Sequence, residues 1–303
     1  MSRRVYNELK SLLTESTLDK SERLEQLSTR QILDLINSED HKIAPAVKKS
    51  IPQIERAVDI VTGVFRSGGR LFYVGAGTSG RLGVLDASEC PPTFGAKPSM
   101  VQGIIAGGRR TLVRSREGIE DDTRAAVSDV QKKDVGKGDV IIGIAASWRT
   151  PYTLAAVKEG KKRGARTIYI CCTPIKKMPF KVDVIINPIT GPEVVTGSTR
   201  MKAGTTTKLV LNMITTTAMI KIGKTYGNRM VDLQAKSEKL RERSKRILIE
   251  ITGISYSQAE KFIDEARGSV KVALVMILKG VSDSRARKLL KEADGFVYRA
   301  LDK

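Results

Sequence analysis

Apolar residues form five short, nearly continuous runs in the middle of the chain. The runs are Leu71 to Val74, Met100 to Ala106, Val140 to Ala145, Thr167 to Cys171 and Val182 to Ile186. Such runs are typical of strands buried on both faces, and the segments between them are long enough for helices. This alternation predicts an α/β fold with a doubly wound parallel sheet flanked by helices.

Helical patterns precede the first strand. Ser28-Thr29-Arg30-Gln31 is a capping-box sequence that predicts a short helix through Ile36. Apolar residues then recur at helical spacing from Val47 to Val61. We therefore expect an N-terminal helical arm over residues 1–69 and the sheet domain over residues 70–236.

The end of the chain lacks strand patterns. A long helix is predicted from Met201 to about Gly223, and strand signals stop after Asp232. Ser257 and Glu260 resemble another capping box, and Val270 to Leu278 has the composition of a buried helix. Residues 237–303 are therefore expected to form a subdomain of three or four helices, and no internal repeat is apparent.

A glycine- and hydroxyl-rich turn directly follows the first predicted strand. Gly75, Gly77 and Gly80 allow a sharp turn and a close approach to a ligand, while Thr78 and Ser79 offer donors at a helix N-terminus. The dinucleotide fingerprint fits poorly, because no acidic residue ends the next strand, and no Gly-Lys-Ser/Thr of a P-loop follows. The turn predicts a site for a small phosphorylated ligand at the carboxyl edge of the sheet.

The composition is that of a soluble globular protein, with 41% apolar and 28% charged residues. No apolar segment is long enough to span a membrane, and the first residues lack the apolar core of a signal peptide, so we expect a cytoplasmic protein. Cys90, Cys171 and Cys172 lack metal-ligand spacing. They are expected to be buried free thiols, with no metal site.

The net charge of +20 favours anionic partners. It would steer an anionic substrate, and it could equally give nonspecific affinity for nucleic acid. Because the basic residues are scattered and only 5% of residues are aromatic, no base-stacking platform is apparent. We expect a solvated basic surface and no specific nucleic-acid partner.

Proton transfer in this chain has to use groups other than histidine. The single histidine, His41, lies in a polar segment before the sheet, so Glu89 and Glu120 are the leading candidates. Pro91 and Pro92 are expected to end the helix that carries Glu89, whose apolar neighbours would raise its pKa. The alternatives are a helix-end carboxylate in an ion pair for Glu89, and an exposed acidic turn or helix cap for Glu120.

The glycine-rich turn, together with further blocks in order, resembles the N-acetylmuramic acid 6-phosphate etherases of the sugar isomerase (SIS) superfamily. The other blocks are Gln26 to Thr29, Gly143 to Ser147, Arg149 to Tyr152, Gly191 to Thr205, Lys208 to Met213 and Tyr226 to Asp232. The resemblance implies an SIS-type sheet domain and removal of the lactyl ether from N-acetylmuramic acid 6-phosphate. The products would be N-acetylglucosamine 6-phosphate and D-lactate, formed by elimination and water addition without a metal or redox cofactor.

The resemblance also assigns site residues. Glu89 matches the catalytic glutamate of the family, and Glu120 matches a second functional glutamate. The expected substrate- and phosphate-binding residues are Gly77, Thr78, Ser79, Ser147, Thr150, Ser198, Thr199 and Lys202. One position departs from the family pattern, because Trp148 replaces a glycine beside Ser147. A tryptophan there loses easy access to positive φ, and its ring would lie at the pocket rim, or point outward or into a subunit contact.

Family members pair through the sheet domain, so a homodimer is expected. Two other functions remain open from the sequence. The SIS fold and similar glycine motifs also occur in a non-catalytic sugar-phosphate sensor, the glucokinase regulatory protein, and in sugar-phosphate isomerases. Glu89, within Asp86 to Pro92, favours the etherase.

Overall fold

The computed structural model describes residues 12–175, 178–233 and 238–303. The chain divides into two compact units, Met1–Ala87 with Ser99–Thr215 and Ser88–Pro98 with Thr216–Lys303. The three domains expected from the sequence stay a prediction, and their boundary at residues 236 and 237 lies outside the described residues. No helix in the described ranges is long and apolar enough to cross a membrane.

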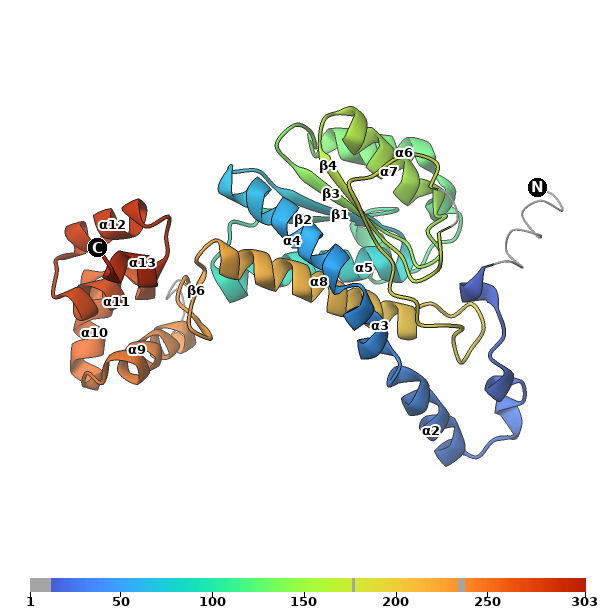
Figure 1. The fold of residues 1–303 in the computed structure, drawn as a ribbon, viewed down its shortest axis with the longest axis horizontal. Coiled ribbons are helices and arrows are strands. Elements are labelled where there is room, and N and C mark those ends of the chain that lie inside the picture. Colours follow the sequence, from blue (N-terminus) through green and yellow to red (C-terminus); the bar gives the residue numbers. More distant parts are fainter. Residues whose placement is uncertain (1–11, 176–177, 234–237) are drawn as a thin grey trace. The chain divides into compact units, whose positions relative to one another are not determined.

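A five-stranded parallel sheet forms the centre of the first unit, which confirms the predicted α/β fold (Figure 1). Its strands are β1 (Leu71–Gly75), β2 (Val101–Ile105), β3 (Val140–Ile144), β4 (Arg166–Ile170) and β5 (Val184–Ile186). The strand order is β2-β1-β3-β4-β5, so the direction of winding reverses between β1 and β3. Ligands of such sheets bind outside the carboxyl ends of the strands at this reversal.

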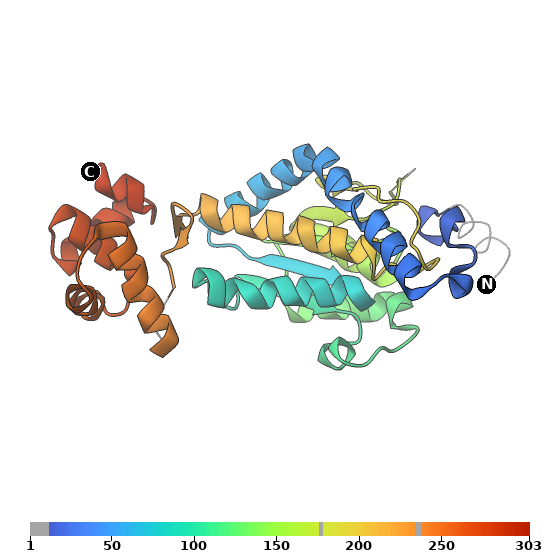
Figure 2. The same ribbon diagram turned by 90° about the horizontal axis from the view of Figure 1, so that it is seen from below.

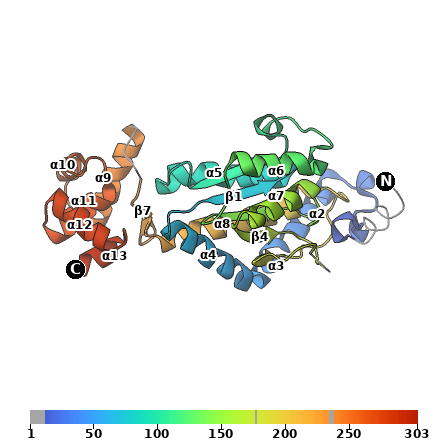
Figure 3. The same cartoon turned by 90° about the horizontal axis from the view of Figure 1, so that it is seen from above.

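Helices cover both faces of the sheet (Figures 2 and 3). The helices that lie in this unit are α2 (Thr29–Asp40), α3 (Ile43–Lys49), α4 (Ile51–Arg66), α6 (Thr123–Lys132) and α7 (Pro151–Lys162), and α5 (Gly77–Phe94) and α8 (Lys202–Lys221) begin in it and end in the second unit. Phe72 and Val74 of β1 share a core cluster with residues of α6 and α7. Tyr73 points to the other face, where it meets α5.

The N-terminal arm follows its capping signal but extends further than expected. Ser28 Oγ accepts a hydrogen bond from the Gln31 amide at 3.3 Å, and Gln31 Oε1 accepts one from the Ser28 amide at 2.8 Å. This confirms the predicted capping box. Helix α2 then continues beyond Ile36 to Asp40, and His41 is exposed at its end, where Nδ1 lies 2.7 Å from the Asn37 carbonyl oxygen.

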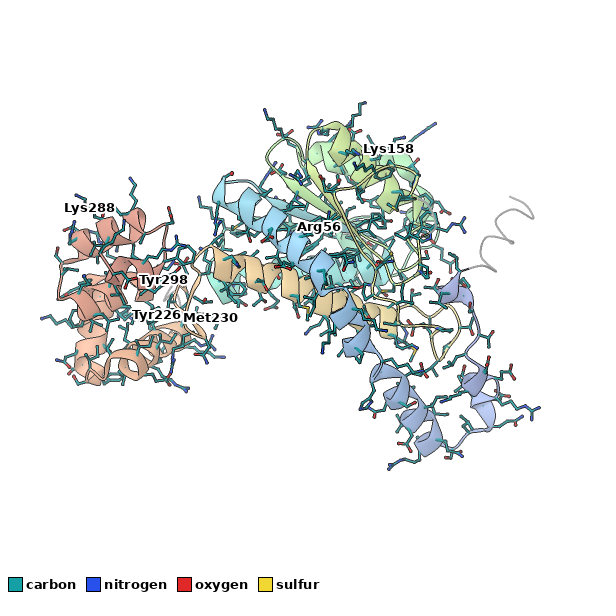
Figure 4. All side chains as sticks on the ribbon, viewed as in Figure 1. Arg56, Lys158, Tyr226, Met230, Lys288 and Tyr298 are labelled. Carbon is teal, nitrogen blue, oxygen red and sulfur yellow. The ribbon has the colours of Figure 1, made fainter. Side chains whose placement is uncertain are left out.

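The second unit contains a short hairpin and five helices in its described part, rather than the three or four expected. The hairpin pairs β6 (Thr225–Tyr226) with β7 (Arg229–Met230), and the helices are α9 (Glu238–Thr252), α10 (Tyr256–Glu265), α11 (Val270–Lys279), α12 (Asp283–Glu292) and α13 (Val297–Leu301). Tyr226 and Met230 pack against the core of these helices (Figure 4). The predicted cap at Ser257 is wrong, because the capping box uses Ser255 and Gln258.

This helical unit contains an internal repeat that the sequence analysis missed. Ser255 and Ser282 cap α10 and α12 with the same backbone angles, φ −69° and ψ 161°. Each helix ends in a matching turn with positive φ, 80° at Gly268 and 79° at Gly295. Further equivalent pairs, all buried, are Ala259 and Ala286, Ile263 and Leu290, Ala266 and Ala293, Val270 and Val297, and Ala273 and Ala300. Helices α10 and α11 therefore correspond to α12 and α13.

Candidate functional site

A pocket of about 320 Å³ lies at the carboxyl edge of the sheet, next to the reversal between β1 and β3. Four segments of the sheet domain and one residue of the N-terminal arm line it. The lining residues are Glu15, Ala76, Gly77, Thr78, Ser79, Arg81, Thr111, Ser115, Arg116, Glu117, Ile119, Glu120, Ala145, Ala146, Ser147, Thr150, Gly197 and Thr199. Seven of the ten residues expected to form the site are therefore brought together here.

The first turn of α5 forms one wall. Gly77 adopts φ +54°, and a Cβ at Gly80 would lie 2.5 Å from the Gly75 carbonyl oxygen. Only glycine allows the helix to begin this close to the end of β1. Thr78 and Ser79 lie in the first turn, where backbone amides lack partners within the helix and the helix dipole favours an anion. This wall therefore suits a phosphate group.

The loop after β3 forms a second wall. Ser147 and Thr150 line the pocket, and Thr150 precedes Pro151 at the start of α7 without capping that helix through its side chain. Its hydroxyl is therefore not used by the helix. Together with Thr78 and Ser79, these side chains give the pocket neutral donors of the kind that suits a phosphate without adding charge.

Trp148 lies between these two residues but does not line the pocket. Its φ is +62°, a left-handed conformation that a glycine would adopt without strain. The ring is partly buried against the core cluster under α6 and α7. The backbone is held on both sides, because the Trp148 amide donates to the Ala145 carbonyl at 2.8 Å and Tyr169 Oη donates to the Trp148 carbonyl at 3.0 Å. The ring therefore packs inward rather than at the expected pocket rim.

The segment before α8 contributes less than expected. Thr199 lines the pocket, whereas Ser198 and Lys202 do not. The Lys202 side chain is buried and its Nζ lies 2.6 Å from Glu39 Oε2. The start of α8 is also occupied, because the buried carboxylate of Glu193 accepts from the amides of Lys202 and Ala203, both at 2.9 Å. This helix N-terminus is therefore satisfied by the protein itself.

Glu120 lies in the pocket on a short 3-10 turn, Ile119–Asp121, and is half-buried. The segment before it is fastened to α5 by Arg81. Arg81 Nε donates to the Leu112 carbonyl at 3.0 Å, and Nη2 donates to the Thr111 carbonyl at 2.7 Å. Glu120 therefore faces the hydroxyl-lined walls from a loop that is tied to one of them.

Glu89 lies apart from this pocket. It is exposed, which contradicts the expectation of apolar enclosure, and it does not line the pocket. From Gly77 to Glu89 the helix rises by about 18 Å, at 1.5 Å per residue. The expectation that the prolines end this helix is also wrong, because α5 continues through Pro91 and Pro92 to Phe94. Pro91 and Pro92 have no backbone N–H, so the last turns of α5 lack two hydrogen bonds within the helix.

Six polar lining residues were not anticipated. They are Glu15, Arg81, Thr111, Ser115, Arg116 and Glu117. Glu15 comes from the arm, far away in sequence, Arg81 lies on α5, and the other four follow β2. The three cysteines are buried free thiols, as expected, and burial raises the pKa of the Cys171 thiol to about 12.

Comparison with known proteins identifies the relatives of this chain. The family model for the glucokinase regulatory protein N-terminal SIS domain matches residues 53–160. An N-acetylmuramic acid 6-phosphate etherase of Geobacillus thermodenitrificans is 51% identical over 97% of this chain and 100% of the relative. The etherase of Symbiobacterium thermophilum is 51% identical over 89% of this chain and 90% of the relative.

Solved structures show weaker likeness. Phosphoheptose isomerase GmhA from Neisseria gonorrhoeae is 16% identical with a TM-score of 0.45, over 61% of this chain and 98% of the other. A putative sugar-phosphate isomerase from Listeria monocytogenes is 14% identical with a TM-score of 0.46, over 64% of this chain and 92% of the other.

The position of Trp148 predicts a conflict between burial and backbone strain. We expect the Trp148→Ala variant to be less stable than Trp148→Gly by about 1 kcal/mol, because both lose the ring but only alanine keeps a Cβ in the left-handed region. Neither variant should lower kcat/KM strongly, since Trp148 does not line the pocket. Thermal unfolding and steady-state kinetics of both variants check this, and equal stability would show that the backbone carries no strain.

The buried pair of Glu39 and Lys202 predicts a large effect on stability. Glu39→Gln leaves a buried lysine without its counter-charge and should cost about 3 kcal/mol, whereas the exposed pair of Arg30 and Asp34 offers a control in Asp34→Asn that should cost less than about 0.5 kcal/mol. Denaturant unfolding measures both.

The same pair gives a pH dependence. Burial of Glu39 opposes its ionisation, but hydrogen bonds from Lys202 and Lys42 outweigh this and lower its pKa from 4.5. The contribution of the pair to the free energy of unfolding is therefore complete above pH 4.5 and is lost as the pH falls through the lowered pKa.

A folded Lys202→Met variant with weakened sugar-phosphate binding would contradict this structural role and restore Lys202 to the binding site.

Proposed function

Since the chain belongs to the N-acetylmuramic acid 6-phosphate etherase family, we infer that it is a carbon–oxygen lyase that cleaves the lactyl ether of N-acetylmuramic acid 6-phosphate. The products are N-acetylglucosamine 6-phosphate and D-lactate, and the reaction belongs to murein amino-sugar recycling. One observation carries this function: 51% identity to a named etherase over 97% of the chain. The regulatory-protein model matches only residues 53–160, so a non-catalytic sensor is not favoured, and neither is an isomerase.

The reaction requires a base at C2 and an acid at the ether oxygen on C3. Ring opening creates a C1 aldehyde that acidifies the C2 proton, so that a base removes it while an acid protonates the ether oxygen that leaves C3. Water then adds at C3 to the unsaturated aldehyde. We assign Glu89 to the ether oxygen and the attacking water, and Glu120 to ring opening or C2 proton transfer.

The pocket supports this assignment for Glu120. Neutral hydroxyls and first-turn amides at Thr78, Ser79, Ser147 and Thr150 suit the 6-phosphate. Glu120 lines the same pocket from the segment that follows β2. A half-buried carboxylate beside a bound sugar is a suitable proton-transfer group.

We propose that two copies of the chain complete the site. Glu89 is exposed and does not line the pocket of its own chain, and this supports a site that the Glu89 of a second copy completes. Two further features support a homodimer. Leu85 on α5 is 51% exposed, and on α8 the apolar side chains of Met213 and Ile220, two turns apart on one face, are also exposed. The free thiols agree with a reducing, cytoplasmic compartment.

The proposed reaction is tested with N-acetylmuramic acid 6-phosphate in heavy-oxygen water. We expect D-lactate release, with the label on C3 of N-acetylglucosamine 6-phosphate, because elimination breaks the bond between C3 and the ether oxygen. The measurement is a lactate assay combined with mass spectrometry of both products. Label found only in lactate would exclude elimination from C3.

The shared site is tested with two carboxylate variants. Glu89→Gln and Glu120→Gln should each lower kcat by roughly 100-fold or more, the usual contribution of a general acid or base, with sugar-phosphate affinity retained. When the two inactive variants are mixed and allowed to exchange subunits, one site of each mixed dimer holds both intact glutamates. Activity should then recover to about a quarter of the unchanged protein, since half of the dimers are mixed and each has one intact site.

As a control, each variant alone is taken through the same subunit-exchange procedure, and it should stay inactive. If both glutamates act within one chain, every site of a mixed dimer carries one defect and mixing restores nothing. Sedimentation at the assay concentration accompanies the experiment, and an active monomer would contradict the homodimer.

A further inference from the structure

Negative side chains outnumber positive ones in the lining of the pocket, although the proposed substrate is an anion. Three are carboxylates, Glu15, Glu117 and Glu120, and two are arginines, Arg81 and Arg116. A carboxylate ligand placed among three protein carboxylates is repelled unless a cation contacts it directly. The two arginines are therefore the lining residues that can offset this repulsion.

Arg81 is already committed to the protein. Its Nε and Nη2 form the edge of the guanidinium that binds a carboxylate side-on with two parallel hydrogen bonds. Here that edge donates to the Leu112 and Thr111 carbonyl oxygens, and Nη2 also lies 3.3 Å from Ser115 Oγ. Arg81 holds the loop in place and adds positive potential, but its bidentate edge is occupied.

The guanidinium of Arg116, unlike that of Arg81, is open to a ligand. Its side chain is exposed at the pocket, and among the described residues it makes neither an ion pair nor a side-chain hydrogen bond. Its charge is therefore uncompensated by a direct partner, although Glu117 and Glu120 follow on the same segment. A guanidinium presents five donors in a planar fork that matches a carboxylate.

The substrate of the proposed function carries two separate anions. The 6-phosphate is at one end of the sugar, and the carboxylate of the lactyl group is attached through the ether at C3. The hydroxyls and first-turn amides of α5 and of the loop after β3 suit the first anion. The second lies next to the C2–C3 bond, where the proposed chemistry of Glu120 takes place.

We propose that Arg116 binds the lactyl carboxylate and thereby selects the ether substrate over sugar phosphates that lack the lactyl group. The inference rests on the proposed function and deepens it. Arg116 and Glu120 belong to one segment, so a sugar whose C2 faces Glu120 brings its C3 substituent toward Arg116. The product N-acetylglucosamine 6-phosphate has no carboxylate, so Arg116 binds substrate without retaining that product.

The experiment compares Arg116→Met with Arg114→Met. Arg114 is exposed on the same segment but does not line the pocket, so both variants lose one positive charge at nearly the same place. Kinetics of lactate release from N-acetylmuramic acid 6-phosphate and calorimetric binding of N-acetylglucosamine 6-phosphate are measured for both. Arg116→Lys is the third variant, which keeps the charge but loses the planar fork.

We expect Arg116→Met to lower kcat/KM about 10- to 100-fold, as for loss of a charge-assisted hydrogen bond. Affinity for N-acetylglucosamine 6-phosphate should stay within about twofold, because a contact to the lactyl group is absent from that ligand. Arg114→Met should leave both quantities nearly unchanged, since exposed charges are screened. Arg116→Lys should fall between the unchanged protein and Arg116→Met.

Three results would overturn the inference. An equal loss of affinity for both ligands would show that Arg116 binds the phosphate. An equal loss in Arg114→Met would show general electrostatic attraction rather than contact. Lactate release that is insensitive to Arg116→Met would exclude any role. Absence of lactate release by the unchanged protein would instead overturn the proposed function, and this inference with it.

Discussion

The close contact between α5 and the sheet determines the rest of this site. A Cβ at Gly80 would lie 2.5 Å from the Gly75 carbonyl oxygen, and one at Gly83 would lie 2.8 Å from Tyr73 Cβ. On the neighbouring strand, a Cβ at Gly103 would lie 2.6 Å from Val84 Cγ2. Side chains at these positions would push the helix away from the strands. The first-turn amides would then move with it, so the proposed phosphate site depends on the absence of three methyl groups.

A buried carboxylate holds the same helix further along. Asp86 accepts hydrogen bonds from Tyr73 Oη at 2.9 Å, from Asn212 Nδ2 at 2.8 Å and from Thr215 Oγ1 at 3.2 Å, which ties α5 to β1 and to α8. Burial raises the pKa of Asp86, and these hydrogen bonds act against that rise. The glycines and Asp86 together fix the first part of α5 against β1 and α8. This helix has the proposed anion-binding turn at one end and Glu89 about 18 Å away.

The sequence predicted the elements that depend on neighbouring residues. It did not predict the contacts between residues that are far apart in the chain. All five sheet strands were predicted within two residues at each end, because each is one apolar run, whereas the two-residue strands of the hairpin leave no pattern. The repeat escaped notice because it is maintained by small residues at matching turns rather than by long identical stretches. In the site, Thr78 and Ser147 follow strand ends and were predictable. The place of Glu15 in the pocket depends on how the arm folds back onto the sheet domain. The same holds for the pairing of Lys202 with Glu39, which is 163 residues away.

The charge of the whole protein and the charge of the pocket lining differ in sign. The net charge of +20 acts over a Debye length and draws an anionic sugar toward the protein. Inside the pocket the balance is reversed, because Glu15, Glu117 and Glu120 outnumber the two lining arginines. Neutral hydroxyls and amides are therefore the groups that remain for the phosphate, and they hold it less tightly than a cluster of lysines would. In the proposed mechanism carboxylates transfer protons on a doubly anionic substrate, so the attracting charge lies outside the pocket and the carboxylates lie inside it. Cations at the phosphate would stabilise substrate and product equally, whereas a cation beside the leaving carboxylate contributes only until lactate departs.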